Sequence, residues 1–334
     1  MASPDGNGFT IDQMIAATDT DAFLVVHKGA LIHETYYNGM QPDSVHLVNS
    51  ISKTFLGILT GILVGEGAID PEARATRYVP EFVGTAFDQT TVRQLLNMTG
   101  AAKSGEDYAV WDDDFWTETA VVGWRPDLSE KAATRSLKQY AFARSETEQR
   151  DGEHFHYRTL MTNALAMVIE GAAQAPVQQL MEQRVWQKLR PEYDASVVLD
   201  AQGFPYFGAG ISASASDLAR FGLMLLNDGL VEGETVVPAQ WVQATGAGSD
   251  DLRTLFAASQ YGAILPGWHY QNQTWACEAD GLLACIGIFG QVIFIHKPSD
   301  LVIVKLSSHP LADSQPQELM AFVAMNHLAS ELAE

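Results

Sequence analysis

Apolar and polar positions are patterned most clearly at the two ends of the chain. Residues 22–37 are rich in β-branched and aromatic side chains on both sides of Lys28-Gly29, which predicts a hairpin of two strands. A closing helix is predicted over 317–332, and strand-like segments precede it at 274–278, 282–289, 292–296 and 302–307. The pattern predicts sheet-forming segments at both ends of the chain.

Helical spacing dominates the middle of the chain. Thr91 is placed to cap a helix over 92–98, and Ser216 to cap one over 217–227. Three more helices are predicted, at 128–143, 159–173 and 177–189. We therefore predict an α/β fold in which a sheet domain is built from two segments, a helical lobe is inserted between them, and the cleft holds the ligand site. The sheet domain takes residues 1–75 and 200–334, and the lobe takes residues 76–199.

One segment, Thr54–Gly65, is apolar almost throughout. Its length of about twelve residues is well below the roughly twenty that a bilayer requires, and charged residues flank it on both sides. Gly57, Gly61 and Gly65 recur at every fourth position, which places a stripe without side chains along one side of a helix. We predict a buried core helix that packs closely against another element.

The composition is that of a globular protein with a large core. The chain has 334 residues, of which 47% are hydrophobic. Its two cysteines, Cys277 and Cys285, lie in apolar sequence and are expected to be reduced core thiols. The stretch Met1–Gly8 has no basic start and no apolar run, so we expect no secretory signal and a cytoplasmic location.

The charge balance excludes two classes of partner. With 41 acidic and 20 basic residues, the formal net charge is −21. Nucleic acid and anionic membranes would be repelled, so neither is expected as a partner. The same acidity is compatible with a saline habitat or with general solubility, and the sequence leaves these two explanations open.

A serine and a lysine three positions apart, Ser50 and Lys53, form the candidate catalytic motif. On a helix these positions share a face, so the lysine nitrogen can reach the serine oxygen and activate it without a histidine. The motif alone is unspecific, because chains of this size often contain it by chance. Its specificity must come from the surrounding sequence.

Other catalytic and metal-binding patterns are incomplete. The pair His154 and His156 and the run Asp112–Asp114 each lack a third ligand at a suitable spacing, so we predict no metal and no cofactor. The two cysteines have no basic neighbour that would activate a thiol. The Gly-x-Ser-x-Gly elbow of α/β-hydrolases does not occur in the sequence.

Several segments in order place the Ser50 motif in a recognisable context. The chain resembles the penicillin-recognising serine hydrolases over about residues 20 to 330, in the class C β-lactamase-like branch with its esterases, D-aminopeptidases and 6-aminohexanoate-dimer hydrolases. The resemblance implies an antiparallel sheet flanked by helices. The segments that carry it are Asn49–Phe55, Tyr78–Phe82, Thr91–Gly100, Phe155–Thr159 and Ser214–Gly222.

The resemblance also implies the catalytic set. Tyr157 stands where the family has a tyrosine, and a neighbouring Lys53 ammonium is expected to bring its phenol toward the working pH. Ser50 would attack the substrate, with Tyr157 and Lys53 moving the proton to the leaving group. The backbone N–H groups of Ser50 and Ile288 would form the oxyanion hole.

Two departures from the family pattern redirect the substrate prediction. The family strand Lys-Thr-Gly is replaced by Cys285–Gln291, in which Gly287 would allow close approach and Gly290 is an alternative anchor. Asparagine two residues after the tyrosine is replaced by Thr159. Both changes remove side chains that would hold a β-lactam, and the pattern is most similar to the 6-aminohexanoate-dimer hydrolase subgroup.

A loop at 105–116 mixes aromatic and acidic residues and is predicted to line a pocket for an apolar chain that ends in an ammonium group. A solvated acidic loop is the alternative. The residues predicted to bind substrate are Tyr108, Trp111, Gly287, Phe289 and Gly290.

The leading hypothesis is a serine hydrolase that acts on small linear amides or esters through an acyl-enzyme. A carboxylesterase of the same family is the nearest alternative, a β-lactamase or D-aminopeptidase is less favoured, and a penicillin-sensor-like binding domain is the alternative that is not an enzyme. The expected partner is a small-molecule substrate. The sequence leaves the oligomeric state open, with a homodimer as one option.

Overall fold

A computed structural model describes residues 8–333, so residues 1–7, on which the prediction about a secretory signal depends, lie outside it. Seven strands form one antiparallel sheet in the order β2-β1-β12-β11-β10-β9-β8. Its strands are β1 (Thr20–His27), β2 (Ala30–Tyr36), β8 (His269–Gln271), β9 (Thr274–Cys277), β10 (Leu282–Gly287), β11 (Gln291–His296) and β12 (Leu301–Ser307).

The predicted N-terminal hairpin is confirmed, and it joins the C-terminal strands. Lys28 and Gly29 both have positive φ, as a tight turn between right-twisted strands requires. Strand β1 is buried and pairs with β12, so that Leu24 lies opposite Val304, while β2 forms an exposed edge. The sheet is thus completed only when the two ends of the chain meet.

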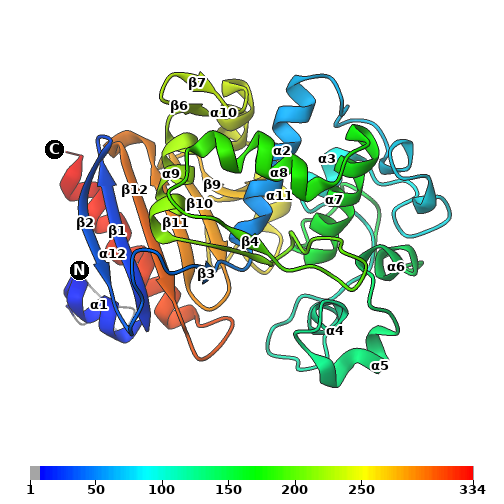
Figure 1. The fold of residues 1–334 in the computed structure, drawn as a ribbon, viewed down its shortest axis with the longest axis horizontal. Coiled ribbons are helices and arrows are strands. Elements are labelled where there is room, and N and C mark those ends of the chain that lie inside the picture. Colours follow the sequence, from blue (N-terminus) through cyan, green and yellow to red (C-terminus); the bar gives the residue numbers. More distant parts are fainter. Residues whose placement is uncertain (1–7, 334) are drawn as a thin grey trace.

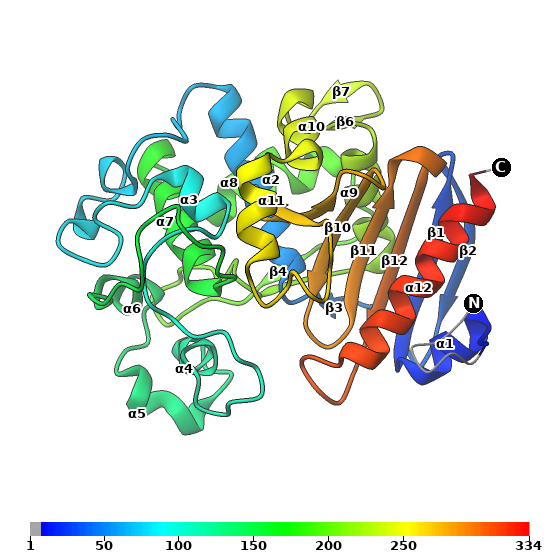
Figure 2. The same cartoon turned by 180° about the vertical axis from the view of Figure 1, so that it is seen from behind.

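Helices cover both faces of the sheet (Figures 1 and 2). Helices α1 and α12 pack on one face, α9 packs on β11 and β12 from the other, and α2 runs beside β9–β11 toward the helical part of the molecule. The helices are α1 (Ile11–Ala17), α2 (Ile51–Gly65), α3 (Val92–Leu96), α4 (Asp114–Val121), α5 (Ser129–Ala132), α6 (Leu137–Phe142), α7 (Thr159–Ala173), α8 (Val177–Arg184), α9 (Ala215–Leu226), α10 (Ala239–Ala247), α11 (Asp250–Ala257) and α12 (Gln315–Leu332).

Short strands and single turns of 3₁₀-helix connect these elements. The short strands form two small sheets, one of β3, β5 and β4 and the other of β6 and β7. They are β3 (His46–Leu47), β4 (Ser196–Val197), β5 (Ile211–Ala213), β6 (Leu230–Val231) and β7 (Glu234–Thr235), and the 3₁₀ turns are Ala75–Arg77, Pro80–Phe82, Pro126–Leu128, Trp186–Leu189 and Lys297–Ser299.

Local capping explains where two of the predicted helices begin. Thr91 caps α3 as predicted, because its hydroxyl accepts from the Gln94 N–H while the Gln94 side chain accepts from the Thr91 N–H. The prediction that Ser216 caps α9 is wrong. Ser214 has the extended backbone of a cap and accepts from the Asp217 N–H, so α9 begins one position after it.

The single helix predicted over 128–143 is also wrong, because the chain breaks it into α5 and α6. Ala133 has a left-handed backbone that ends α5, and Ser136 then caps α6. The carboxylate of Asp200 accepts from the Leu137 N–H at 2.7 Å. This contact with a distant segment adds to the Ser136 cap at the start of α6, and no local pattern could reveal it.

The predicted close packing along the glycine stripe of α2 is confirmed. A Cβ atom on Gly57 would lie 2.1 Å from the Asn272 carbonyl oxygen, and one on Gly61 would lie 2.6 Å from the Trp241 ring. The helix is buried along nearly its whole length. Within residues 8–333, no helix has the length and apolar character needed to cross a membrane.

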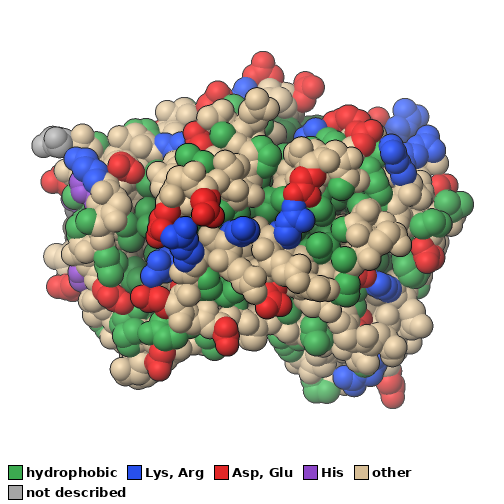
Figure 3. Space-filling view, turned by 45° about the horizontal axis from the view of Figure 1, so that its top comes forward, with side chains coloured by type: hydrophobic (Ala, Val, Ile, Leu, Met, Phe, Trp, Pro, Cys, Tyr) green, Lys and Arg blue, Asp and Glu red, His purple; other side chains and the backbone are tan. Residues whose placement is uncertain are grey.

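Acidic side chains are dispersed over one face of the molecule. Figure 3 shows acidic side chains spread across the visible face, with basic side chains between them.

Both cysteines are free and buried, as predicted.

Candidate active site

The chain places Ser50 and Lys53 at the start of the buried helix α2. Asn49, just before the helix, has a positive φ. Ser50 is the N-cap residue of α2, and Lys53 lies one turn further along the helix. The Lys53 Nζ donates to Ser50 Oγ at 2.9 Å, and the lysine side chain is completely buried. The predicted contact across one helical turn is therefore present in the structure.

Two further acceptors hold the Lys53 nitrogen in place. Nζ donates to Thr159 Oγ1 at 2.9 Å and to the Gly208 carbonyl oxygen at 2.7 Å. Thr159 is the first residue of α7, and Gly208 belongs to the segment that leads into β5. Three elements far apart in the sequence thus converge on one amine.

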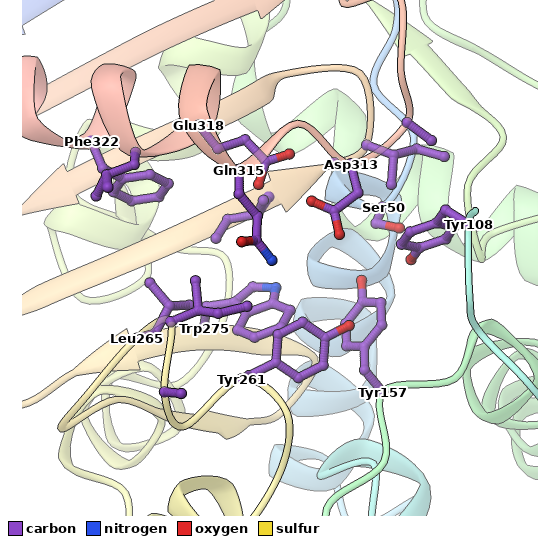
Figure 4. A pocket seen from close by; sticks show the side chains of 17 residues that line it. Ser50, Tyr108, Tyr157, Tyr261, Leu265, Trp275, Asp313, Gln315, Glu318 and Phe322 are labelled. Atoms are coloured by element: carbon purple, nitrogen blue, oxygen red, sulfur yellow. The ribbon is translucent and has the colours of Figure 1, made fainter. Parts of the chain in front are cut away.

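Tyr157 approaches the same point from the segment before α7. The Lys53 Nζ lies 5.0 Å from the centroid of its ring, and its hydroxyl points toward Ser50 (Figure 4). The ring packs against Trp275 of β9, with 5.1 Å between centroids. The His156 N–H donates to the Met98 carbonyl at 2.9 Å and anchors the segment.

Burial moves the pKa values of the two residues in opposite directions. It lowers the pKa of Lys53 to about 8, against the raising effect of Glu106 and Glu118. It raises the pKa of Tyr157 well above its ordinary value, while the Ser50 hydroxyl acts the other way. The expectation that Lys53 would lower the pKa of Tyr157 is not supported, and of the two groups it is Lys53 whose pKa is shifted toward neutral pH.

The end of strand β10 lies directly against the start of α2. A Cβ atom on Gly287 would lie 2.3 Å from the Val48 carbonyl oxygen and 3.1 Å from the Ser50 nitrogen, so only glycine permits this approach. Ser50 and Ile288 line the same cavity. In the described part of the chain, neither of their backbone N–H groups donates to another protein atom. Both remain available to a ligand oxygen.

The cavity in front of Ser50 has a volume of about 370 Å³ and is largely apolar. Tyr157, Tyr261 and Trp275 form one wall, and α12 contributes Phe322 (Figure 4). Besides the hydroxyls of Ser50 and the tyrosines, its polar side chains include Asp313 of the loop before α12 and Gln315 and Glu318 of α12. A second, polar cavity of about 670 Å³ adjoins the first and shares several lining residues with it.

The predicted substrate-binding residues divide into two groups. Tyr108 and Gly287 line the first cavity. Trp111 does not line this cavity. The residue is 56% exposed, and its ring centroid lies 4.8 Å from the guanidinium carbon of Arg125. Phe289 and Gly290 also lie outside both cavities, since the Phe289 N–H donates to Ala312 and Gly290 packs on the His309 ring. The glycine that borders the nucleophile is thus Gly287.

Most residues of the cavity wall could not be predicted from the sequence. Four of these residues belong to no motif, namely Tyr261, Trp275, Asp313 and Glu318. They line one cavity because segments far apart in the sequence fold together there. Glu106 lies in the predicted acidic loop, but its role as an acceptor for Thr159 was not anticipated. Within residues 8–333 there is no group of three or more His, Cys, Asp or Glu side chains that could hold a metal ion.

The fold and the Ser50 site agree with a family assignment. The family model described as Beta-lactamase matches residues 10–321, and the chain belongs to this family. The resemblance predicted from the sequence is thereby confirmed, together with the predicted antiparallel sheet and its flanking helices. By this membership the protein is a serine hydrolase.

One relative and two solved structures give more specific comparisons than the family model. The chain is 33% identical over 306 residues to the 6-aminohexanoate-dimer hydrolase of Paenarthrobacter ureafaciens, a match that covers 91% of this chain and 76% of the relative. A Bacillus anthracis structure provisionally described as a 6-aminohexanoate-dimer hydrolase has a TM-score of 0.83 and 24% identity, covering 100% of this chain and 86% of the other. A family VIII carboxylesterase shares the fold with a TM-score of 0.65 and 14% identity, covering 94% and 96%.

Proposed function

We propose that the protein hydrolyses small linear amides through an acyl-enzyme on Ser50, with 6-aminohexanoate-type amides as its substrate class. The observation that carries this proposal is the buried Lys53 amine, 2.9 Å from Ser50 Oγ at the wall of an apolar cavity. The similarity to the Paenarthrobacter ureafaciens hydrolase supports the choice of substrate.

Acylation begins with attack of Ser50 Oγ on the carbonyl carbon of the amide. Neutral Lys53 takes the serine proton, and the carbonyl oxygen becomes an oxyanion between the N–H groups of Ser50 and Ile288. The neutral Tyr157 phenol gives its proton to the leaving nitrogen and regains one from Lys53. The amine product leaves, and the acyl group remains on Ser50.

Deacylation repeats the same steps with water as the nucleophile. Water attacks the acyl carbon and its proton passes to the Lys53–Tyr157 pair, while Ser50 Oγ leaves as the restored hydroxyl. Besides water, the steps use the side chains of Ser50, Lys53 and Tyr157 and the backbone N–H groups of Ser50 and Ile288. The reaction therefore fits the residues around Ser50 as they stand.

The cavity favours a substrate whose chain ends in an ammonium group. Its apolar walls suit a methylene chain, and Asp313 and Glu318 place two carboxyl groups in it. Burial raises the pKa of Asp313 and raises that of Glu318 to about 7, and a substrate ammonium beside them would favour their ionised forms. No Lys or Arg is among the described residues that line this cavity. A 6-aminohexanoyl group, with an amine at the far end of its chain, matches both properties.

The proposed function is tested by turnover of the 6-aminohexanoate dimer against that of p-nitrophenyl esters. We expect release of 6-aminohexanoate, together with a covalent adduct on Ser50 after treatment with a serine-reactive phosphonate, measured by mass spectrometry. Turnover of short esters with no hydrolysis of the dimer would refute the amidase and leave the carboxylesterase. An adduct-free Ser50 would refute both and favour a binding domain.

The carboxylesterase remains the second candidate because a family VIII carboxylesterase shares the fold. The likeness concerns the fold alone. Hydrolysis of β-lactams is less favoured, because the strand beside Ser50 carries Cys285 and Ile286 before Gly287 and therefore lacks the family's lysine and threonine.

The rate of acylation is expected to rise with pH and to level off above about pH 8. Only the neutral Lys53 amine accepts the Ser50 proton, and its pKa is about 8, so kcat/KM should fall about tenfold for each pH unit below that value. A pH–rate profile on the dimer measures this. Lys305, the other buried lysine, has its pKa lowered by burial to about 7, and Lys305→Met should leave the midpoint in place. A flat profile between about pH 6 and 9 would contradict Lys53 as the base.

A further inference from the structure

Behind the Lys53 amine, Thr159 connects the lysine to the carboxylate of Glu106. The Lys53 Nζ donates to Thr159 Oγ1 at 2.9 Å, and Thr159 Oγ1 donates to Glu106 Oε1 at 2.7 Å. The Thr159 backbone N–H donates to the other carboxylate oxygen at 2.7 Å, and the Tyr108 hydroxyl donates to Oε1 at 3.0 Å. Both oxygens of Glu106 are thus engaged, and two of their hydrogen bonds come from one residue.

The chemistry of these groups fixes the direction of each hydrogen bond. Burial raises the pKa of Glu106, against the lowering effects of the Lys53 charge and of the hydrogen bonds that the carboxylate accepts. The two hydrogen bonds from Thr159 and the one from Tyr108 are all donated to Glu106, which is the arrangement of an ionised carboxylate. An ionised carboxylate only accepts, and a threonine hydroxyl has a single proton to give. Because that proton is directed to Glu106, Thr159 Oγ1 presents only lone pairs to Lys53. The Gly208 carbonyl, 2.7 Å from Nζ, likewise only accepts.

A neutral lysine amine has two N–H groups and one lone pair. Thr159 and Gly208 each require an N–H from Lys53, so the third direction, toward Ser50 Oγ at 2.9 Å, is left for the lone pair. When Lys53 is protonated, the same direction carries its third N–H. Loss of one proton therefore converts the Ser50 contact into the geometry of a general base with no movement of the side chain.

We propose that Glu106, acting through Thr159, is a positioning residue that directs the lone pair of Lys53 toward Ser50. The inference rests on the proposed function and adds to it the residue that orients the base. Its role corresponds to that of the carboxylate in Ser-His-Asp triads, with a threonine hydroxyl placed between the carboxylate and the base.

The other ionisable groups around Lys53 do not have this connection. Glu118 is buried on α4 and accepts from the Asn163 amide, and burial raises its pKa to about 8. The phenols of Tyr157 and Tyr108 stay neutral, because burial raises the pKa of each well above its ordinary value. Glu106 and Glu118 both raise the pKa of Lys53, but only Glu106 contacts Thr159.

Glu106→Gln tests the proposal because it should reverse the Thr159 hydroxyl. The Thr159 N–H still requires an oxygen, so the new amide turns its NH₂ toward Thr159 Oγ1. The threonine hydroxyl can then donate a hydrogen bond to the lone pair of Lys53. This hydrogen bond competes with transfer of the Ser50 proton to the same lone pair. We expect the second-order rate of Ser50 phosphonylation to fall on the order of 10- to 100-fold. The midpoint of the pH profile should move to lower pH, because a charge that raises the pKa of Lys53 is removed.

Thr159→Val and Thr159→Ser separate positioning from folding. Valine removes the hydroxyl and should lower the rate to a similar extent, whereas serine keeps the hydroxyl and should recover most of it. Glu146→Gln is the matched surface control. Glu146 pairs with Lys103 at 2.8 Å on the surface, so its substitution should change neither rate nor midpoint. Thermal melting of each variant reports whether it is folded.

Two outcomes would overturn the positioning role. One is a folded Glu106→Gln protein with the wild-type rate and midpoint, and the other is equal rates for the valine and serine variants of Thr159. The Thr159 pair decides the question if Glu106→Gln does not fold. Failure of the wild-type protein to react with the phosphonate would instead refute the proposed function, and the inference with it.

Discussion

Ser50→Ala is expected to abolish hydrolysis while leaving the protein folded. The variant lacks the oxygen that forms the acyl-enzyme, so kcat for the 6-aminohexanoate dimer should fall by on the order of 10⁴- to 10⁶-fold. The change costs little stability, because Lys53 keeps Thr159 and Gly208 as acceptors. Product release and thermal melting measure the two effects separately.

Ser52→Ala is the matched control on the same helix. Ser52 Oγ accepts from the Ile211 N–H at 3.0 Å and is fully buried, so its removal should lower stability by about 1 kcal/mol and leave turnover intact. The two serines are thus expected to give opposite results. An active Ser50→Ala variant would show that another residue is the nucleophile.

Gly287→Ala is expected to have the second largest effect on activity. The added Cβ would lie 2.3 Å from the Val48 carbonyl oxygen and 3.1 Å from the Ser50 nitrogen, so β10 must move away from the start of α2. The Ile288 N–H then moves away from the Ser50 N–H, and the oxyanion loses one donor. We expect kcat to fall about 10²- to 10³-fold. Steady-state kinetics on the dimer should show a smaller change in KM.

Gly246→Ala provides the control for this substitution. Its Cβ would meet only Leu283, at an ordinary distance of 3.7 Å, and the residue lies inside helix α10. Activity should be unchanged, and stability should rise by about 0.5–1 kcal/mol because alanine favours the helix. If Gly287→Ala retains wild-type kcat, the assignment of Ile288 to the oxyanion hole is wrong.

Elements with strong local patterns were predicted well from the sequence. The N-terminal hairpin, helix α7, and the late strands β9 to β12 occur close to the predicted ranges, because alternation, helical spacing and turn residues act over a few neighbours. Helix α4 was not predicted. Its first three residues lie in the loop predicted at 105–116, and its acidic and aromatic residues show no clear apolar face. Ser214 and Ser216 are equally good caps by sequence, and backbone geometry alone selects Ser214.

In the candidate site, too, some features could be predicted from the sequence and others could not. The contact of Lys53 with Ser50 follows from their spacing on one helix, and Tyr157 followed from the family resemblance rather than from any local pattern. The predicted pocket residues Trp111, Phe289 and Gly290 lie outside the cavity because their side chains or backbone bind other parts of the chain. The division into a sheet domain and a helical lobe stays a prediction.

The sequence by itself determined the local structure at the nucleophile. A serine and a lysine one turn apart on a buried, glycine-striped helix depend only on neighbouring residues. The class of fold followed from the order of the segments along the chain, and the exclusion of polyanionic partners stays a prediction from the net charge. The tertiary structure alone decided what surrounds that helix. Glu106, Thr159 and Gly208 reach Lys53 from separate segments, and Asp313 and Trp275 reach the cavity from others. Burial that lowers the pKa of Lys53 to about 8 is a property of this whole assembly, because it depends on every segment that excludes water from the amine.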